Sequence, residues 1–459
     1  MPPNIPVDLD LIRRYNQPGP RYTSYPTAPH FHDNYGPASF AEDLATGASD
    51  TPLSLYLHLP FCKSLCYYCG CHMKVTQDRA LIDEYLTALK QEIDLVARHV
   101  NTDRSVVQIH WGGGTPTYLT PDQIRDLGRH LHDRFQIAEN AEISLEADPR
   151  TLTQDRIEAA VSVGVNRLSI GVQDVNRTVQ EAINRVQSIE QVENAVRWTR
   201  EYDVASVNVD LIYGLPHQTP DRFANTLDVT EQLAPDRIAL YSYAHVPSMK
   251  NHQRVIEEET LPDPEDKLRL FKQGIERLTG SGGYRFIGMD HFARPDDKLA
   301  QAQDHGDLHR NFQGYSTRAD AEVVAFGVSG ISQFEGAYAQ NVKALPAYYD
   351  RIEKEQLGAY RGYRLTPEDQ LRRHVITQLM CHFQLDKAAV EEQFGVDFDT
   401  TFASALERLK PMEADGLVTL SPEAIHVHST GRLLIRNVAM AFDAYWQAEH
   451  EQPVHAETV

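Results

Sequence analysis

The sequence predicts an α/β fold, a partial or complete (β/α) barrel with an arm before it and a smaller, mainly helical region after it. Six short apolar segments alternate with amphipathic helical segments across about 190 residues. Such alternation requires crossover connections, and these give a parallel sheet. Six units are more than a small doubly wound sheet needs, so a barrel is the better prediction.

The predicted strands and helices follow one another in a regular order from Leu53. The first helix has apolar residues at four-three-four-three spacing from Ile82 to Val96, as one buried helix face requires. The next helix begins with a capping box, Thr120 to Gln123, which fixes its start. The six predicted strands are 53–59, 106–111, 142–147, 167–172, 206–212 and 237–243.

Residues 1–50 are expected to form an N-terminal arm. They show no clear hydrophobic period, and Pro and Gly residues are spread through them. Tyr22, Ser24 and Tyr25 carry rings and hydroxyl groups that are suited to closing a barrel mouth. The arm is therefore predicted to contribute to a site and not to form a domain.

The barrel domain is predicted over 51–350 and a second domain over 351–459. In the second domain, Thr366 caps a new helix and 416–436 are predicted to form a β-hairpin, a winged-helix-like layout. A DNA-binding domain of this kind would carry a basic second helix, but the helix here is acidic. A packing or lid role is therefore favoured over DNA binding.

Composition and charge exclude several classes of partner. The chain has 459 residues, 65 acidic and 44 basic, with a formal net charge of −21. Long-range repulsion opposes binding to nucleic acid or to an anionic membrane. No stretch approaches the ~18 apolar residues of a membrane-spanning helix, and the first residues lack the apolar core of a signal peptide. We expect a cytoplasmic protein, and a monomer because no apolar stripe calls for a partner.

Four of the five cysteines lie within ten residues, and this cluster is the strongest chemical signal in the sequence. Cys62, Cys66, Cys69 and Cys71 in one loop of a reducing compartment indicate a metal or cluster site. Structural zinc is one alternative, although no second pair of ligands is available for it. An iron–sulfur cluster with three ligands and one open iron is favoured. Cys381 lies in an apolar helical stretch and is predicted to be a buried hydrophobic residue.

Polar residues also follow the predicted strands in succession. In a (β/α) barrel the carboxyl ends of the strands meet on one face, where ligands bind. Each residue alone could be a turn or capping residue, but six successive strands carry one. These residues are His58, the glycine run 111–116, Glu146, Asp148, Gln173, Asp174, Asp210, 213–216 and His245.

The cysteine loop resembles the signature of radical S-adenosylmethionine (SAM) enzymes. Its spacing is C-x3-C-x2-C, and the glycine run follows one βα unit later. The resemblance implies that Cys62, Cys66 and Cys69 bind a [4Fe–4S] cluster whose open iron chelates SAM. Glycines would let backbone groups approach that ligand closely.

Further motifs across residues 10–445 resemble the oxygen-independent coproporphyrinogen III oxidases. These motifs are PGPRYTSYPTA, HLPFCKSLCYYCGC, HWGGGTPTYL, GVQD, DLIYGLP, IGMDHFARPDD, HRNFQGY and GRLLIRN. The resemblance implies a partial (β/α)6 TIM-like barrel, open on one side and covered by the C-terminal domain. It also implies decarboxylation of two propionates of coproporphyrinogen III to vinyl groups, giving protoporphyrinogen IX. The electron donor and the final acceptor are not identified by the sequence.

The same resemblance assigns roles to individual positions. Cys71 matches a fourth cysteine that is not a cluster ligand, and it is assigned a catalytic role. One set matches contacts to the cluster-bound SAM: Tyr56, Gly113, Glu146 and Ile331. Another set matches a second SAM, giving two per chain: Tyr68, Gly114, Thr115, Gln173, Arg185, Asp210 and Ala244.

Two questions remain open at this level. A sister family with a similar barrel binds haem as a chaperone and lacks oxidase activity; the arm and Cys71 favour the oxidase. A substrate with four carboxylates also needs local cations in so acidic a chain. Arg294 and Arg310 are predicted to bind propionates, although Arg294 could instead pair with a neighbouring aspartate, and Arg21 on the arm is the next candidate.

Overall fold

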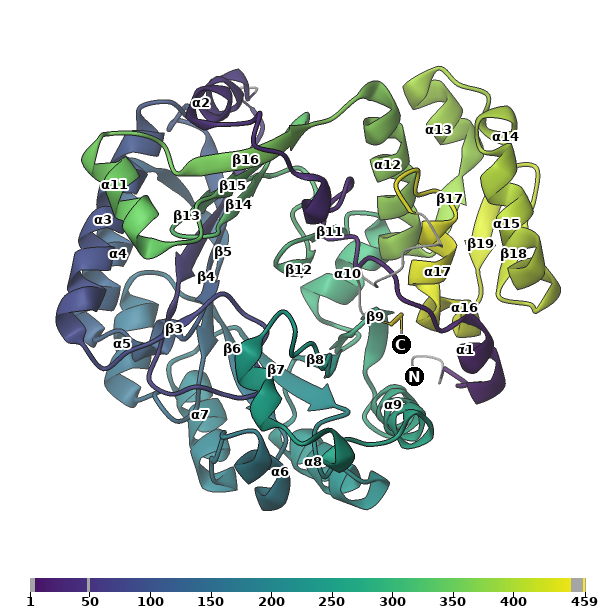
Figure 1. Ribbon diagram of the computed structural model, residues 1–459, viewed down its shortest axis with the longest axis horizontal. Helices are drawn as coiled ribbons and strands as arrows, with labels where there is room; N and C mark the ends of the chain where they lie inside the picture. The colour runs from purple at the N-terminus through teal and green to yellow at the C-terminus, as the bar shows by residue number, and fades with distance from the viewer. Residues whose placement is uncertain (1–4, 48–49, 447–456, 459) are drawn as a thin grey trace.

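The computed structural model describes residues 5–47, 50–446 and 457–458, and within them a curved twelve-stranded sheet is the central element (Figure 1). The six strands predicted from the sequence are confirmed as neighbouring parallel strands in chain order. They are β1 (Leu53–Leu59), β4 (Ser105–Gly113), β5 (Gln136–Ala147), β6 (Arg167–Gln173), β7 (Ser206–Tyr213) and β8 (Arg237–Ser242).

Additional strands extend both edges of this sheet. One edge adds β13, parallel to β1, and then three antiparallel strands; the other adds β10 and β9. In the described part of the chain the outermost strands do not pair, so the barrel is open on one side. Strand β16 (Ala359–Arg364) belongs to this sheet, although it lies past residue 350, the domain boundary predicted from the sequence. The added strands are β13 (Glu322–Phe326), β14 (Ile331–Gln333), β15 (Ala337–Asn341), β16 (Ala359–Arg364), β10 (His291–Ala293) and β9 (Arg285–Gly288).

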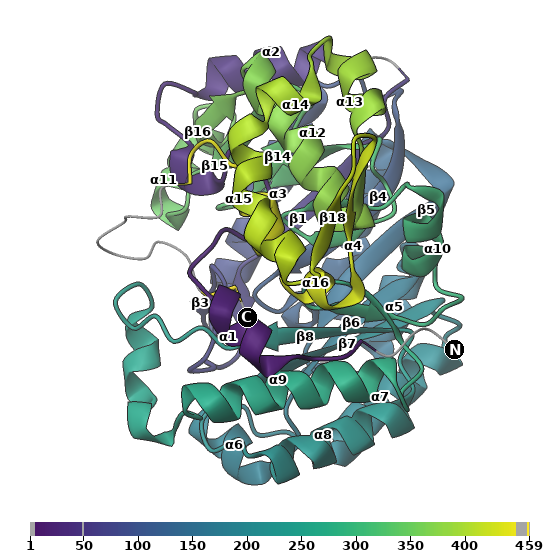
Figure 2. The same cartoon turned by 90° about the vertical axis from the view of Figure 1, so that its right-hand side faces the viewer.

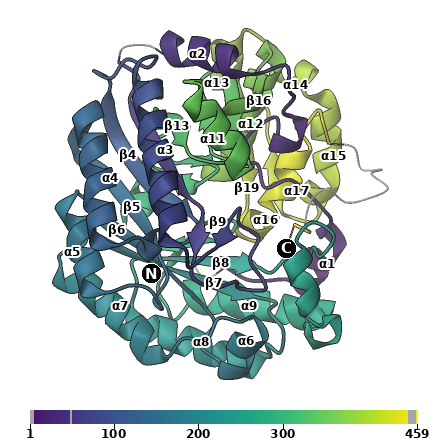
Figure 3. The same ribbon diagram turned by 60° about the vertical axis from the view of Figure 1, so that its left-hand side comes forward.

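Helices cover the outer face of the parallel strands (Figures 1 and 3). The predicted apolar face of the first barrel helix is confirmed, since every residue at the predicted spacing is buried. The capping box of Thr120 and Gln123 is also confirmed. The barrel helices are α3 (Arg79–Ala97), α4 (Pro121–Arg134), α5 (Gln154–Ser162), α6 (Arg177–Ala182), α7 (Ile189–Glu201), α8 (Pro220–Leu233), α9 (Pro264–Thr279), α10 (Lys298–His305) and α11 (Leu345–Glu353).

The C-terminal elements form a separate group of helices beside the open side of the sheet (Figure 2). They surround a small antiparallel sheet of β17 (Gln384–Asp386), β19 (Ala424–Val427) and β18 (Val418–Leu420). The predicted hairpin therefore ends at Val427, and the apolar run after it is helical; a short apolar run does not distinguish a strand from a buried helix. The helices are α12 (Pro367–His382), α13 (Lys387–Phe394), α14 (Phe398–Thr401), α15 (Ala403–Ala414), α16 (Ser429–Leu433) and α17 (Ile435–Met440), and Cys381 in α12 is fully buried.

The N-terminal arm packs into the core. It contains α1 (Leu9–Tyr15) and α2 (Pro37–Thr46). The hydroxyl of Tyr22 donates to Asp443 over 2.9 Å, and the hydroxyl of Tyr25 accepts the amide of Ala444 over 2.9 Å. These tyrosines thus bind the arm to the C-terminal domain. Parts of the predicted arm and C-terminal domain (1–4, 48–49, 447–456 and 459) lie outside the described residues.

A buried glutamate fixes the turn between β13 and β14. Glu92 of α3 accepts hydrogen bonds from the Gly327 amide (2.6 Å), the Asn341 amide group (2.6 Å) and the Tyr348 hydroxyl (2.8 Å). These bonds connect α3 to the added strands and to α11, and so they place Ile331 at the inner face of the barrel. Across the described residues, no helix has the length and apolar character needed to cross a membrane.

Candidate active site

The cysteine loop lies at the carboxyl end of β1, next to the end of β4. The amide of Gly114 donates to the Leu59 carbonyl (2.9 Å), and the amide of Thr115 donates to the Phe61 carbonyl (2.9 Å). A Cβ atom on Gly114 would lie 2.6 Å from the carbonyl oxygen of Pro60. The glycine run therefore allows these two strand ends to pack directly against each other. The amides of Gly114 and Thr115 are therefore already hydrogen-bonded within the protein.

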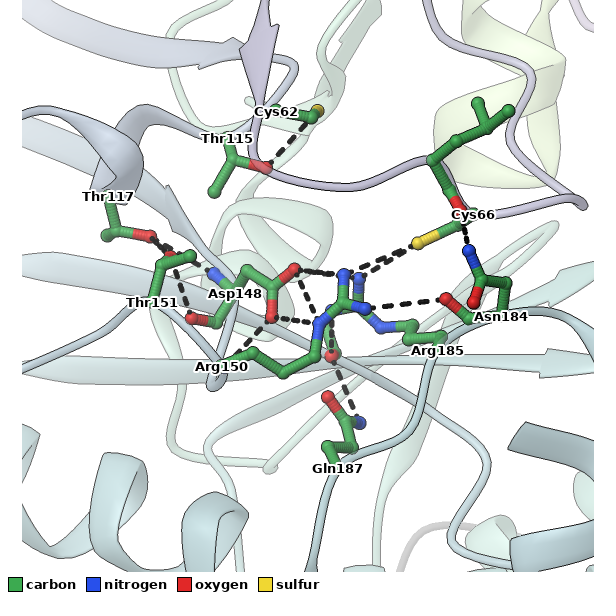
Figure 4. A network of polar contacts seen from close by, with 12 residues as sticks. Cys62, Cys66, Thr115, Thr117, Asp148, Arg150, Thr151, Asn184, Arg185 and Gln187 are labelled. Carbon is green, nitrogen blue, oxygen red and sulfur yellow. Dashed lines mark hydrogen bonds and ion pairs between the residues drawn. The ribbon is translucent and has the colours of Figure 1, made fainter. Parts of the chain in front are cut away.

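Two guanidinium groups lie against Cys66 (Figure 4). Arg150 Nη2 is 3.4 Å and Arg185 Nη1 is 3.7 Å from Cys66 Sγ, and both side chains form ion pairs with Asp148. Burial alone would raise the pKa of Asp148, but Arg185 and Arg150 outweigh it and lower that pKa to about 2. Two cations and one carboxylate leave a net positive charge beside Cys66 Sγ.

Other donors hold the rest of the loop. The hydroxyl of Thr115 is 3.3 Å from Cys62 Sγ. His252 Nε2 donates to the carbonyl of Cys69 over 2.7 Å. A hydrogen bond from Cys71 lowers the pKa of Cys69 to about 6, and the same contact raises the pKa of Cys71. Each of the three cysteines in the C-x3-C-x2-C spacing thus has a hydrogen-bond donor beside its sulfur.

These residues fit a [4Fe–4S] cluster. A cube binds three cysteines at three different irons, so the sulfurs need not converge on one point. Zinc would require that convergence, and in the described chain no three Cys, His, Asp or Glu side chains are grouped to hold a single metal ion. Hydrogen bonds and cations beside the sulfurs suit an anionic cluster.

A central cavity of about 570 Å³ lies inside the barrel beside this loop. Tyr56 stacks on His110 at 5.8 Å, and its hydroxyl donates to His58 Nδ1 over 3.0 Å. Burial lowers the pKa of His58 to about 4, so His58 is neutral and can accept this bond. Its lining includes Tyr56, Glu146, Tyr241, Asn311, Phe312, Gln313 and Ile331.

Glu146 is an ionised carboxylate facing this cavity. It accepts hydrogen bonds from His110 Nε2 (3.1 Å) and from the Gly113 amide (3.1 Å). Burial would raise the pKa of Glu146, but these two donors outweigh it and lower that pKa. The structure therefore brings Tyr56, Glu146 and Ile331 of the first predicted set to one cavity. The fourth member, Gly113, is hydrogen-bonded to Glu146.

The second predicted set is more spread out. Asp210 accepts from Ser169 (3.0 Å) and Asn208 (2.8 Å), and burial, with the nearby Glu146, raises its pKa to about 6. The other members lie around the same strand ends. Gln173 and Arg185 lie over Gly171, and Tyr68 packs against the apolar cluster that includes Val179 and Ile212. Gly114 and Thr115 contact the backbone of Leu59 and Phe61, and Ala244 lines a different cavity beyond β8.

Arg294 does not lie near this site, which corrects one prediction. β10 runs antiparallel to β8, with Ala293 opposite Arg237 at the start of β8. Arg294 consequently lies at the amino end of β8, where its Nε donates to the Pro235 carbonyl over 3.1 Å. That is the barrel end opposite to the cysteine loop.

Several residues around the site were missed by sequence reasoning. Arg150, two residues after Asp148, contacts Cys66, and His110 holds Glu146. The motif HRNFQGY forms the hairpin β11 (His309–Asn311) and β12 (Gly314–Ser316). This hairpin presents Asn311, Phe312 and Gln313 to the central cavity. The sequence indicates Phe312 as an aromatic neighbour of Arg310, whereas the only signal for Asn311 and Gln313 is their place in the motif HRNFQGY.

The chain is similar to known proteins over nearly its whole length. Residues 56–230 match the radical SAM superfamily, and residues 365–434 match the HemN C-terminal domain. The oxygen-independent coproporphyrinogen III oxidase of Escherichia coli (strain K12) is 48% identical over 441 residues, covering 96% of each chain. The enzyme of that name from Synechocystis is 44% identical over 100% of this chain and 99% of its own. The solved structure of coproporphyrinogen III oxidase (HemN) from Escherichia coli superposes with a TM-score of 0.92 at 46% identity, covering 97% of this chain and 100% of that one.

Proposed function

Because the chain belongs to the family of oxygen-independent coproporphyrinogen III oxidases, we propose that it decarboxylates two propionate side chains of coproporphyrinogen III to vinyl groups, giving protoporphyrinogen IX. The observation that carries this proposal is the cysteine loop and the ionised Glu146 at the edge of one cavity. As a radical SAM enzyme, the chain uses a [4Fe–4S] cluster and SAM.

We propose that Cys62, Cys66 and Cys69 bind the cluster, with Cys71 as a catalytic residue beside it. The chemistry supplied by the bound cluster and SAM is one-electron cleavage to a 5′-deoxyadenosyl radical that removes hydrogen from the propionate β-carbon. Arg150 and Arg185 balance the negative charge at Cys66. The one-electron donor and the final acceptor are proposed to be external to this chain.

Two SAM molecules are proposed per chain. Tyr56, Gly113, Glu146 and Ile331 would contact the first, and Glu146 would accept from its amino group. The second would lie along the ends of β6 and β7, where Asp210 and Arg185 offer opposite charges. The remaining proposed contacts to the second are Tyr68, Gly114, Thr115, Gln173 and Ala244.

The hairpin β11–β12 would cover the substrate. Phe312 lies across the central cavity and offers a flat apolar face to a pyrrole ring. Within the described residues the side-chain amide nitrogen of Gln313 is buried without a hydrogen-bond partner. A buried donor without an acceptor favours a ligand that supplies one, and a propionate carboxylate does so.

The test of this function is turnover under anaerobic conditions. Protein with a reconstituted cluster, SAM and a one-electron reductant should convert coproporphyrinogen III to protoporphyrinogen IX, measured by chromatography of the oxidised porphyrins. The alternative is a haem chaperone, which predicts stable haem binding and transfer without decarboxylation. Curated relatives aligned over nearly the full chain carry the oxidase name, so the chaperone is not favoured.

Binding of the second SAM should depend on pH through Asp210. Burial and Glu146 raise the pKa of Asp210 to about 6, and a cationic ligand binds the ionised form. Affinity should be constant above about pH 7 and should fall about tenfold towards pH 5, because the proton must leave before the ligand binds. Equilibrium dialysis with labelled SAM measures this. Asp210→Asn should bind weakly and lose the pH dependence; an unchanged pH profile in that variant would contradict the assignment.

A further inference from the structure

A second cavity, of about 460 Å³, lies on the other side of β8 from the central cavity. It is lined by residues from distant parts of the chain: the arm, the end of β7, β8 with the residues after it, α9, the β9–β10 segment, α16 and α17, and residues 457–458. Tyr241 lines the central cavity, whereas its neighbours Leu240 and Ser242 line this one. The two cavities therefore adjoin at the carboxyl end of the same strand. We name the second one the arginine cavity, after Arg21 and Arg436 in its lining.

Positive charge exceeds negative charge around this cavity in the described part of the chain. Three cations line it, Arg21, Lys267 and Arg436, against two carboxylates, Asp290 and Glu457. Arg21 forms an ion pair with Asp290. Burial, with the nearby Arg21 and Arg310 guanidinium groups, lowers the pKa of Arg436 to about 10. Neighbouring guanidinium groups lower a pKa only where positive charge accumulates.

Lys267 in the cavity lining and Arg310 next to Arg21 are two cations that lack full hydrogen-bonding partners. The ammonium group of Lys267 makes no hydrogen bond or ion pair with any described residue, and burial lowers its pKa. Arg310 is 5% exposed, and its Nη1 has no hydrogen-bond partner among the described residues. Its Nε donates to the Arg21 carbonyl, so it adds to the same positive region. A buried cation of this kind is costly unless a ligand supplies an anion.

We propose that the arginine cavity binds propionate carboxylates of the tetrapyrrole substrate while the reacting ring lies in the central cavity. This inference rests on the proposed function. A ring system with four peripheral carboxylates can extend past β8 and place one or more of them beside Arg21 and Lys267. The chain has a net charge of −21, which repels an anionic substrate at long range. The positive charge gathered in the arginine cavity would attract the substrate's carboxylates at short range. The carboxylate of the second SAM is the other source of the same chemistry, since Ala244 lines this cavity.

Binding of stable probes to the holoenzyme tests the proposal. Coproporphyrin III supplies the four carboxylates, and its tetra-amide supplies the same ring without charge. Arg21→Met and Lys267→Met should each weaken coproporphyrin III binding about tenfold, the effect of losing one charged contact, and leave tetra-amide binding unchanged. Asp290→Asn removes a competing carboxylate and should tighten coproporphyrin III binding. A gain of affinity cannot arise from misfolding, so this variant remains informative if another folds poorly.

The control is Arg197→Met, which removes an exposed arginine of α7 that pairs with Glu201 far along the outer surface. It should bind both probes as the unmodified protein does. Equal coproporphyrin III binding in the Arg21, Lys267 and Asp290 variants would overturn the proposal, as would a selective loss of SAM binding. If the unmodified enzyme fails to decarboxylate coproporphyrinogen III, the proposed function is wrong; if it turns over and the variants bind normally, only this inference is wrong.

Discussion

Serine at Cys62, Cys66 or Cys69 is expected to abolish cluster binding and all SAM cleavage, whereas serine at Cys71 should leave the iron content near normal. A serine hydroxyl is a hard ligand that stays protonated, and an iron–sulfur cluster requires soft thiolates. Purified under anaerobic conditions, the three ligand variants should be nearly colourless, and the Cys71→Ser variant should keep about four irons per chain. Iron analysis and absorption spectra make the comparison.

The Cys71→Ser variant is the matched control because it removes a thiol from the same loop. Cys71 has an exposed side chain and contacts Cys69, so its loss should lower decarboxylation without dissolving the cluster. If Cys71→Ser loses its iron as the other variants do, the cluster has four protein ligands and the open iron is absent. Normal turnover in Cys71→Ser would instead remove its catalytic assignment.

Glu146→Gln is expected to weaken binding of the cluster-bound SAM about a hundredfold, because a charge-assisted hydrogen bond contributes roughly 1.5–3 kcal/mol. Glutamine keeps the size of the side chain and can still accept the Gly113 amide. The variant loses the negative charge of the Glu146 carboxylate, which hydrogen bonds from His110 and the Gly113 amide keep ionised. Equilibrium dialysis of SAM and the yield of 5′-deoxyadenosine measure the effect.

Glu139→Gln provides the control for Glu146→Gln. Glu139 lies on the same strand, β5, but it is exposed. Its loss should change SAM affinity by less than about twofold, as is typical of exposed surface charges. Iron content should be normal in both variants. An unchanged SAM affinity in Glu146→Gln, with the cluster intact, would show that Glu146 does not contact this ligand.

The local pattern of the sequence determined the parallel core and the position of the chemistry. Alternating apolar strands and helices specify βα units, because each helix face and strand must be buried against its neighbours. That pattern located β1, β4 and β6 to β8 within two residues at each end, whereas β5 begins six residues before the predicted start; the carboxyl ends of the strands located Glu146 and Asp210. The cysteine spacing is likewise local, since one loop carries Cys62, Cys66 and Cys69.

Only the tertiary structure decided which distant residues meet around that core. β13, β14 and β15 pair antiparallel through short turns, and β16 follows α11 but also pairs antiparallel, so the alternation that predicts parallel βα units does not reveal these strands. Arg294 and Arg310 have similar sequence surroundings, yet antiparallel pairing of β10 with β8 sends Arg294 to the opposite barrel end. Arg21, Lys267 and Arg436 converge only because the arm and α17 pack against the end of β8. Charge at a site depends on long-range packing, which no local period encodes.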